Sequence, residues 1–463
     1  VIHSGTLNIS GGTLDIDDNY TASGNITTNI SGGIIKVEGN WTATGNGFTP
    51  TGGTVEFSGS VEQTISLASG NNFYDLKINN SNATEKVSAQ GSSLVVSNHL
   101  NIADGIFESA SDYHDVTIAT GSSLQLTGDI TVSGNWTNNG TLIAPPPSTV
   151  IFDGIGPQII TNNGISSTKE FSNVIIDNTF LAPSDGNDVD SDAIKVTETL
   201  TISDGQFQPS ANSDFGGLTV SSNGILKPEA NAIITVFDNW INSGTFIHNN
   251  GTVILKESMH YSMHGTPLIF GDNIFNNLSI DLGGSNININ GLNHVEGILD
   301  MIDGWILTDI YMNNNSSVTN ASINSHFVGG TVTKDFFDPQ SFTFPLGIGQ
   351  SGYRPITLTS STTNTNSLSA AHMFAVQNQN SLNSSLSSIE TYGWDIQRSG
   401  GTDGFNITIP FDASYSITDF NNLTIAMWDG TEWIEVPSTV TGTSASGSIT
   451  TNSTVSDFSN RYF

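Results

Sequence analysis

The chain contains no cysteine and little charge of either sign. Without thiols it can form neither a disulfide framework nor a cysteine-ligated metal site. Charged residues make up 12% of the sequence, about half of the ~25% usual for globular proteins. No apolar run approaches the roughly 18 residues of a membrane-spanning helix, and the sequence opens without the basic and apolar segments of a signal peptide. We therefore expect a processed, soluble chain that does not insert directly into a membrane.

The charge that is present is mostly negative. Acidic residues number 43 and basic residues 11, which gives a net charge of −32. Such a surface repels nucleic acid and anionic membranes, and it attracts cations as small partners. We expect no nucleic-acid partner.

Internal repetition is the strongest signal in the sequence. Trp41, Trp136 and Trp240 lie 95 and 104 residues apart, and each follows an asparagine. Three further landmarks recur at intervals of 95 to 104 residues. They are Phe57, Phe152 and Leu255 in TVxF-like segments, Phe73, Phe171 and Phe275 in FxxLxI-like segments, and Asp104, Asp204 and Asp303 in turns. Three modules of roughly a hundred residues follow one another, with a diverged partial module at the start.

Short alternating triplets such as VTI, LQL and ITV predict the fold within each module. Alternation with β-branched residues is typical of strands that have one buried face, and Gly, Asn, Asp and Ser between them favour turns. The even spacing predicts an all-β fold, a right-handed parallel β-helix (β-solenoid) of roughly fifteen coils over residues 1–330. A propeller is the weaker alternative.

The segment ITVSGNWTNNGT, residues 130–141, is interpreted as one corner of a coil. We expect Ile130 and Val132 to point inward, Gly134 and Asn135 to form the turn, and Trp136 to cover the stacked interior. The functional alternative is a row of exposed tryptophans that binds sugar rings.

The pattern changes near residue 330, where the modular landmarks end. Longer alternating runs rich in aromatics predict a β-sandwich-like capping domain over residues 331–463. All three arginines, Arg354, Arg398 and Arg461, fall in this segment. We expect them to form ion pairs or stacking contacts within the domain rather than a catalytic site.

The GNWT, TVxF and FxxLxI series resembles the β-helical surface proteins of Bacteroidota that are exported by the type IX secretion system. FTFPLGIGQSGYRPITL, YGWDIQRSGG, LTIAMWDGTEW and TVSDFSNRYF resemble the module that precedes the C-terminal sorting domain in such proteins. The resemblance implies an extracellular or cell-surface location. Removal during export would account for a sequence without signal peptide or sorting domain.

Residue types argue against catalysis, and we expect no enzyme and no required cofactor. Residues 1–330 contain no arginine and seven lysines, whereas a polysaccharide lyase needs basic groups to take a proton and neutralise an anionic sugar. The cluster Asp15, Asp17 and Asp18 is interpreted as a solvated turn rather than a hydrolase pair. His260 and His264 have metal-ligand spacing only on a helix, which this segment does not predict.

One loop has the composition of a cation site. SDGNDVDSD, residues 184–192, carries five oxygen-bearing side chains at nearly alternating positions: Asp185, Asn187, Asp188, Asp190 and Asp192. Calcium takes six to eight oxygen ligands, but the distal bidentate Glu of a typical calcium loop is missing. A calcium site and a solvated insertion both remain open.

Two classes of function follow. The first is a non-catalytic extracellular structural protein, namely a cell-surface stalk, adhesin or filament subunit. The second is a carbohydrate-binding or polysaccharide-processing β-helix protein. Expected partners are surface glycans, cell-envelope components or another copy of the chain bound head-to-tail, because Val1 opens directly in strand-like sequence. An unpaired first coil would be covered by upstream sequence or by a neighbouring subunit.

Overall fold

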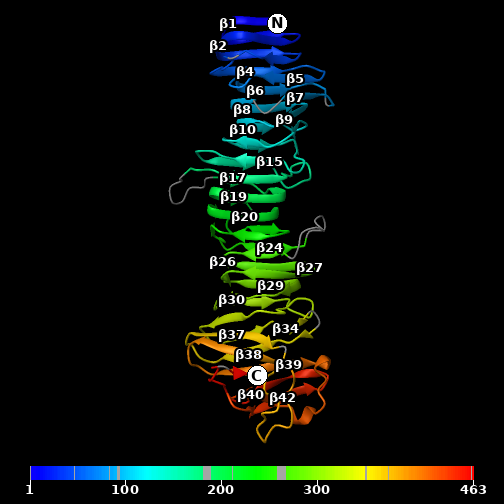
Figure 1. The fold of residues 1–463 in the computed structure, drawn as a ribbon, viewed down its shortest axis with the longest axis vertical. Coiled ribbons are helices and arrows are strands. Elements are labelled where there is room, and N and C mark those ends of the chain that lie inside the picture. The colour runs from blue at the N-terminus through cyan, green and yellow to red at the C-terminus, as the bar shows by residue number, and fades with distance from the viewer. Residues whose placement is uncertain are drawn as a thin grey trace. The chain divides into compact units, whose positions relative to one another are not determined.

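The computed structural model describes residues 2–45, 47–82, 84–90, 94–180, 189–210, 212–257, 267–349, 352–373, 375–459 and 461–463. The fold is all-β and contains a parallel β-solenoid of about 15 turns with additional antiparallel sheets near the C-terminus (Figure 1). The prediction of a solenoid is therefore confirmed. Two compact units are distinguished, Val1–Thr235 with Ser243–Asn249 (unit 1) and Val236–Asn242 with Asn250–Phe463 (unit 2).

Unit 1 is built of parallel coils. Each coil pairs with the next through strands that follow one another in the chain. One such series is β1 (Ile2–Ile16), β2 (Tyr20–Val37), β4 (Gly52–Phe57), β6 (Phe73–Asn79), β8 (Val95–Asp104) and β10 (Asp112–Ile118). Because the pairing is parallel and in register, equivalent side chains stack directly on one another along the coils.

An inward column of apolar side chains shows this register. It runs through β6, β8, β10, β12 (Ile130–Val132), β15 (Thr149–Phe152), β17 (Asn173–Asp177), β19 (Lys195–Pro209) and β20 (Ser213–Leu226). Its members are Phe73, Val96, Tyr113, Val132, Phe152, Ile176, Ile202 and Val220. All are buried, and each large apolar side chain contributes about 1.5–3 kcal/mol. Ile130 and Val132 lie in the core, as the sequence predicts.

Unit 2 changes from parallel to antiparallel pairing within one sheet. The order of its seven strands is β26 (Asn273–Phe275), β28 (Asn293–Val295), β30 (Ile310–Met312), β32 (Val332–Phe336), β37 (Asn366–Met373), β38 (Gly393–Gly400) and β44 (Arg461–Tyr462). The pairs up to β30–β32 are parallel, whereas β32–β37 and all later pairs are antiparallel. The strand β37 therefore covers the edge that β32 would otherwise expose.

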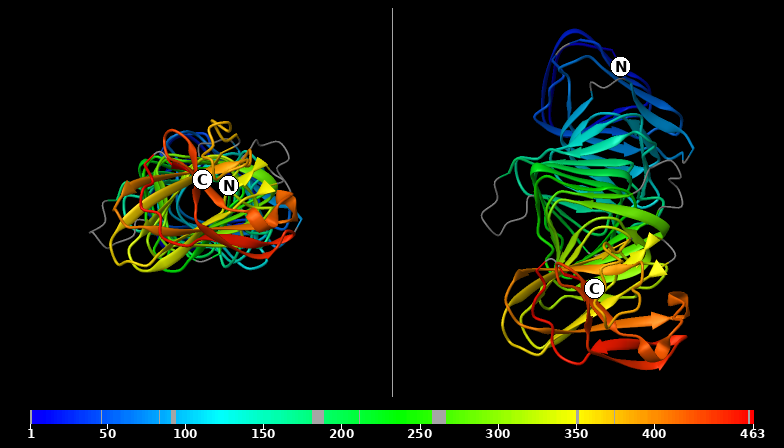
Figure 2. Two further views of the ribbon diagram at one scale, coloured as in Figure 1. Left: turned by 90° about the horizontal axis from the view of Figure 1, so that it is seen from below. Right: turned by 60° about the horizontal axis from the view of Figure 1, so that its bottom comes forward.

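A second sheet of unit 2 is antiparallel throughout. Its order is β33 (Gln340–Phe344), β36 (Ile356–Ser360), β39 (Phe405–Asp412), β43 (Ser446–Thr451) and β42 (Ser438–Thr443). The rings of Phe336 on β32 and Phe405 on β39 lie 4.9 Å apart and join the two sheets. These strands are drawn from yellow to red in Figure 2. The predicted domain division at residue 330 stays a prediction.

The strand β32 also carries a buried cation. Lys334 is fully buried, and its Nζ donates hydrogen bonds to the carbonyl oxygens of Asn313, Asn314 and Ser316. The ammonium lies 5.1 Å from the centroid of the Phe342 ring. Burial lowers the pKa of Lys334 to about 8, against the opposing charge of Asp335. The side chain fastens the turn of the preceding coil to β32.

Candidate functional site

The repeated tryptophans lie inside the coils. Trp41, Trp136 and Trp240 are all 0% exposed. Trp41 stacks on Tyr20 at a ring-centroid distance of 3.9 Å, and Trp136 lies 5.6 Å from Phe171. Their predicted role in covering the interior is confirmed, and the alternative of a sugar-binding row at these three positions is wrong, because no ring face reaches solvent.

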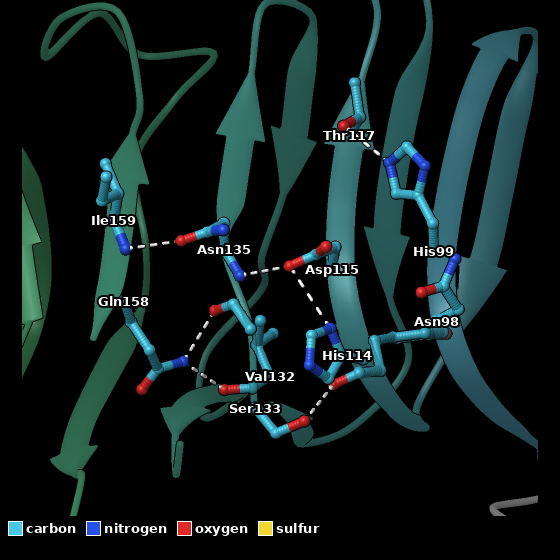
Figure 3. A network of polar contacts seen from close by, with 12 residues as sticks. Asn98, His99, His114, Asp115, Thr117, Val132, Ser133, Asn135, Gln158 and Ile159 are labelled. Atoms are coloured by element: carbon cyan, nitrogen blue, oxygen red, sulfur yellow. Dashed lines mark hydrogen bonds and ion pairs between the residues drawn. The ribbon is translucent and has the colours of Figure 1, made fainter. Parts of the chain in front are cut away.

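The asparagine before each of the first two tryptophans links adjacent coils. The side-chain oxygen of Asn135 accepts the backbone N–H of Ile159 at 2.9 Å, and the Asn135 N–H is in turn bound by Asp115 at 2.6 Å (Figure 3). Asn40 accepts the N–H of Thr64 at 2.7 Å in the same way. At a corner the strand ladder is interrupted, so a side chain supplies the acceptor that a neighbouring carbonyl supplies elsewhere.

This corner clamp recurs in both units. Asn or Asp oxygens accept a backbone N–H from a residue 20 to 26 positions later, on the next coil. Further examples are Asp129 to Thr149, Asn173 to Thr199, Asp272 to Leu292, Asn277 to Ile298 and Asp309 to Thr331. The abundance of Asn and Asp thus has a structural use beyond turn formation.

A buried glutamine completes the motif in the first two modules. The Gln158 amide donates to the carbonyl oxygens of Val132 and Gly134 at 2.9 and 2.7 Å (Figure 3). Its oxygen accepts from the Gly154 N–H and the Asn178 side chain. All four hydrogen-bonding positions of the amide are occupied.

Gln63 makes the same four contacts 95 residues earlier. It donates to Val37 and Gly39, and it accepts from Gly59 and Asn80. We call each set, Gln63 with Asn80 and Gln158 with Asn178, a glutamine knot. Both glutamines are almost fully buried. The signal for it in the sequence is Gly-x-x-x-Gln after TVxF, which hydropathy alone would place on the surface. The third module lacks this signal, because Glu257 and Tyr261 stand where the glycine and the glutamine would be.

The glycine of the motif is required by close approach. A Cβ on Gly39 would lie 2.6 Å from the Asn19 side-chain oxygen, and one on Gly134 would collide with Asp115 and His114. Gly, Asn and Trp therefore have separate tasks in each GNW segment. The glycine carbonyl binds the glutamine, the asparagine binds the next coil, and the tryptophan fills the core.

The predicted calcium loop is only partly described. Asp185, Asn187 and Asp188 lie outside the described residues. Asp190 lies on β18 (Val189–Ser191) between two buried residues. Both carboxylate oxygens of Asp192 accept backbone N–H groups, from Asn162 at 2.9 Å and Asn163 at 2.6 Å. Asp192 thus binds two N–H groups of an earlier segment, the reverse direction of the corner clamps, and the calcium site stays a prediction.

The other candidate ligands do not form a cluster in the described structure. Asp15, Asp17 and Asp18 are exposed, but Asp15 lies on β1, and only Asp17 and Asp18 lie in the bend that follows this strand. His260 and His264 lie outside the described residues. Within the described ranges, no group of three or more His, Asp or Glu side chains has a metal-binding arrangement.

Lysines of the coils form ion pairs with the neighbouring coil. Lys77 lies 3.4 Å from Glu56, Lys195 lies 2.7 Å from Glu170, and Lys256 lies 3.5 Å from Asp281. Lys86 pairs with Glu108. Burial alone would raise the pKa of Glu108, but hydrogen bonds from Lys86 and Ser88 lower it.

The three arginines form ring contacts and an ion pair within the antiparallel region, as the sequence predicts. The Arg354 guanidinium lies 4.0 Å from the centroid of the Tyr415 ring, and Arg398 lies 5.2 Å from that of Phe458. Arg461 pairs with Asp457. Hydrogen bonds from Thr362, Asn366 and Asn364 lower the pKa of Asp403, which anchors the loop before β39.

A cavity of about 770 Å³ lies in the same region of unit 2. It is bordered by β38, β39, the hairpin of β40 (Ile425–Trp428) and β41 (Trp433–Val436), and the loop of residues 385–390. Its aromatic lining comprises Tyr392, Trp394, Phe411, Tyr415, Trp433 and Phe463. The sequence suggested aromatics here but not that they would surround a cavity, because a cavity depends on how strands and loops pack together.

The fold and these contacts define the protein as a parallel β-solenoid with a C-terminal antiparallel region. No family model, curated protein or solved structure matches the chain. Among the described residues, no helix has the length and apolar character to cross a bilayer.

Proposed function

We propose that the chain is a non-catalytic structural protein of the cell exterior, which serves as a stalk, adhesin or filament subunit. The proposal rests on one observation: polar side chains repeatedly form hydrogen bonds or ion pairs between coils. The glutamine knots, corner clamps and lysine pairs all connect one coil to another. A resemblance to exported β-helical surface proteins supports the location.

Electron microscopy of antibody-labelled source cells tests this role. We expect label on the outer surface of intact cells. A strain in which Gln63 and Gln158 are both replaced by leucine should lose surface layer or adhesion, because its coils are loosened. A strain with Gln125→Leu, at a half-buried position between buried leucines, is the matched control. Label confined to the cell interior, or a double variant that keeps both its surface layer and its adhesion, would contradict the proposal.

Self-association is the more specific form of the proposal. A second copy bound head-to-tail would place its antiparallel region against β1 of its neighbour, and main-chain hydrogen bonds would supply the affinity. Sedimentation velocity over a wide concentration range distinguishes the forms. Growth of large species with concentration supports a filament subunit. A monomer at every concentration rules out the filament and leaves a stalk or adhesin.

A further inference from the structure

The cavity in the antiparallel region has the size of a small-molecule site. Its volume of about 770 Å³ falls within the ~300–1,000 Å³ typical of ligand pockets. The residues that line it all belong to unit 2, and they come from both sheets, from the β40–β41 hairpin and from the loop of residues 385–390.

The aromatic walls are held in place by hydrogen bonds made away from their ring faces. The indole N–H of Trp394 donates to the Arg354 carbonyl at 2.9 Å, and that of Trp433 donates to the Gln377 carbonyl at 3.0 Å. Tyr392 is 45% exposed and lies 6.2 Å from the His372 ring. Burial, with the charge of Arg354 adding to it, lowers the pKa of His372 to about 4, so this neighbour is neutral at pH 7.

The segment just before the loop of residues 385–390 is fastened to the hairpin. Ser381 accepts a backbone hydrogen bond from Trp433 at 2.7 Å, and Asn383 donates one back to the Trp433 carbonyl at 2.9 Å. The Asn383 side chain donates to Glu432 at 3.2 Å. The wall is therefore built before any ligand arrives, which lowers the entropic penalty of binding.

The polar groups of the cavity are acceptors and neutral donors. Glu390, Asp419 and Glu435 supply carboxylates, Asn421 and Asn422 supply amides, and neither lysine nor arginine is among the lining residues. In the described part of the chain, the buried hydroxyl of Tyr415 has no hydrogen-bond partner. Because this hydroxyl is enclosed, the hydrogen-bonding groups that the cavity offers to a bound molecule are the carboxylates and amides.

We propose that this cavity binds a neutral carbohydrate. Sugar rings present apolar C–H faces that pack on aromatic rings, and their hydroxyl groups donate to carboxylates and amides. An anionic sugar would meet three carboxylates without a basic residue in the lining. This inference is independent of the structural role proposed above, because the lining residues make none of the glutamine-knot contacts.

Titration of the full chain with neutral disaccharides tests the site. Cellobiose and maltose are the probes, tryptophan fluorescence follows Trp394 and Trp433, and saturation-transfer NMR detects the bound sugar. We expect saturable binding of at least one disaccharide. Tyr392→Ala should raise its Kd roughly tenfold, which corresponds to the loss of one stacking contact. Tyr415→Phe, which removes only the enclosed hydroxyl and keeps the ring, should leave the Kd close to that of the wild type.

Matched controls keep the test decisive. Tyr74→Ala, at a half-buried position on β6 in unit 1, should leave the Kd unchanged. Circular dichroism and melting curves confirm that the variants fold. Glucuronic acid should bind more weakly than glucose by each measure. The proposal is overturned if neither disaccharide saturates, or if Tyr392→Ala binds as tightly as the wild type. It is also overturned if tetramethylammonium, a cation attracted by aromatic rings, displaces the sugar at lower concentration than glucose does.

Discussion

At the scale of single residues, the most informative side chains are buried and polar. An amide such as that of Gln158 is tolerated inside a coil because every one of its hydrogen-bonding positions is used. Removing it leaves carbonyl and N–H groups without partners, and each such buried group costs about 1–3 kcal/mol.

We predict that Gln158→Leu lowers local stability by about 3 kcal/mol, since the Val132 and Gly134 carbonyls and the Gly154 N–H lose their partner together. Hydrogen exchange followed by mass spectrometry should show faster exchange in peptides that contain Gly154. Gln125→Leu, between buried leucines on β11 (Ser123–Leu126), should change exchange little. Equal protection in both variants would show that the knot is dispensable.

Lys334 gives a prediction about pH. Its pKa in the folded chain is about 8, whereas an unfolded lysine titrates near 10.4. Between these values the unfolded state binds more protons, so the free energy of unfolding rises with pH, by at most about 1.4 kcal/mol per unit. Melting curves of the wild type and Lys334→Met should show the wild type gaining relative stability from pH 8 to 10.

Buried tyrosines set an upper limit to the pH range in which the free energy of unfolding rises. Burial raises the pKa of Tyr20 and Tyr353 to about 12, so folding stability is lost as pH rises beyond 10, where the unfolded tyrosines ionise. The comparison with Lys334→Met removes this common contribution. A constant difference between the two melting temperatures from pH 8 to 10 would contradict the lysine prediction.

The sequence predicted which apolar side chains are buried in the core, but not which polar ones. The alternation around Ile130 and Val132 and the recurrence of Trp136 predicted their burial, because apolar periodicity directly reports the inward face. The burial of Gln63 and Lys334 could not be predicted in the same way. Their positions depend on carbonyl groups of other coils, whose directions are set only once the corners are formed.

At the scale of elements, the junction between β32 and β37 decides how a parallel sheet ends. A parallel edge presents a repeating row of donors and acceptors that another chain can extend. The antiparallel strand β37 occupies this row on β32, and β38 covers β37 in turn.

We predict that Ser369→Pro weakens this closure. Ser369 lies in the middle of β37, which is paired on both sides, so a proline removes a ladder hydrogen bond wherever its nitrogen points. The expected outcome is faster hydrogen exchange in β32 and concentration-dependent association by sedimentation. Ser369→Thr, which suits a strand, should behave as the wild type. Unchanged exchange in β32 after the proline substitution would show that the edge does not depend on β37.

The acidic segment of residues 184–192 leads to a prediction about calcium. We expect residues Asp185 to Asp192 to bind calcium weakly and to rigidify the adjoining coil, since five oxygen-bearing side chains fall within eight positions. Calorimetry should give binding heat for the wild type and none for the double variant Asp188→Ala, Asp190→Ala. Asp177→Ala, an exposed acid on β17, serves as the control. Identical traces for wild type and double variant would remove the idea.

At the scale of the whole molecule, the charge is the dominant property. A net charge of −32 opposes compaction because like charges on successive coils repel one another. The lysine pairs between coils offset only part of this repulsion, given 11 basic residues against 43 acidic ones.

We predict that salt stabilises the chain. The screening length falls from about 30 Å at 0.01 M to about 3 Å at 1 M ionic strength, which suppresses repulsion between exposed carboxylates. Melting temperature should rise by a few degrees, on the order of 1–3 °C, between these conditions at pH 7. Sodium chloride and tetramethylammonium chloride should act alike. A fall in melting temperature with salt would show that the inter-coil ion pairs outweigh the repulsion.

The class of fold was predictable from the sequence, whereas the cavity was not. Landmarks such as Trp41 and Trp136 recur at a fixed interval, and stacking of identical units turns that interval directly into coils. The cavity instead arises where the hairpin of β40 and β41 meets β38 and β39, which are consecutive in the chain but share no periodicity. Its aromatic residues look like ordinary core residues until the sheets are placed.

The glutamine knot has a consequence for how such a chain can change over evolutionary time. All of its donors and acceptors fall between Val37 and Asn80 in one copy and between Val132 and Asn178 in the other. A duplicated gene segment of one module would thus carry a complete set of bonds into its new place. Such a gene can gain or lose whole modules without requiring any new contact. A deletion that ends inside a knot would instead leave its buried amides without hydrogen-bond partners. We expect inserted and deleted segments among relatives to begin and end outside these two spans.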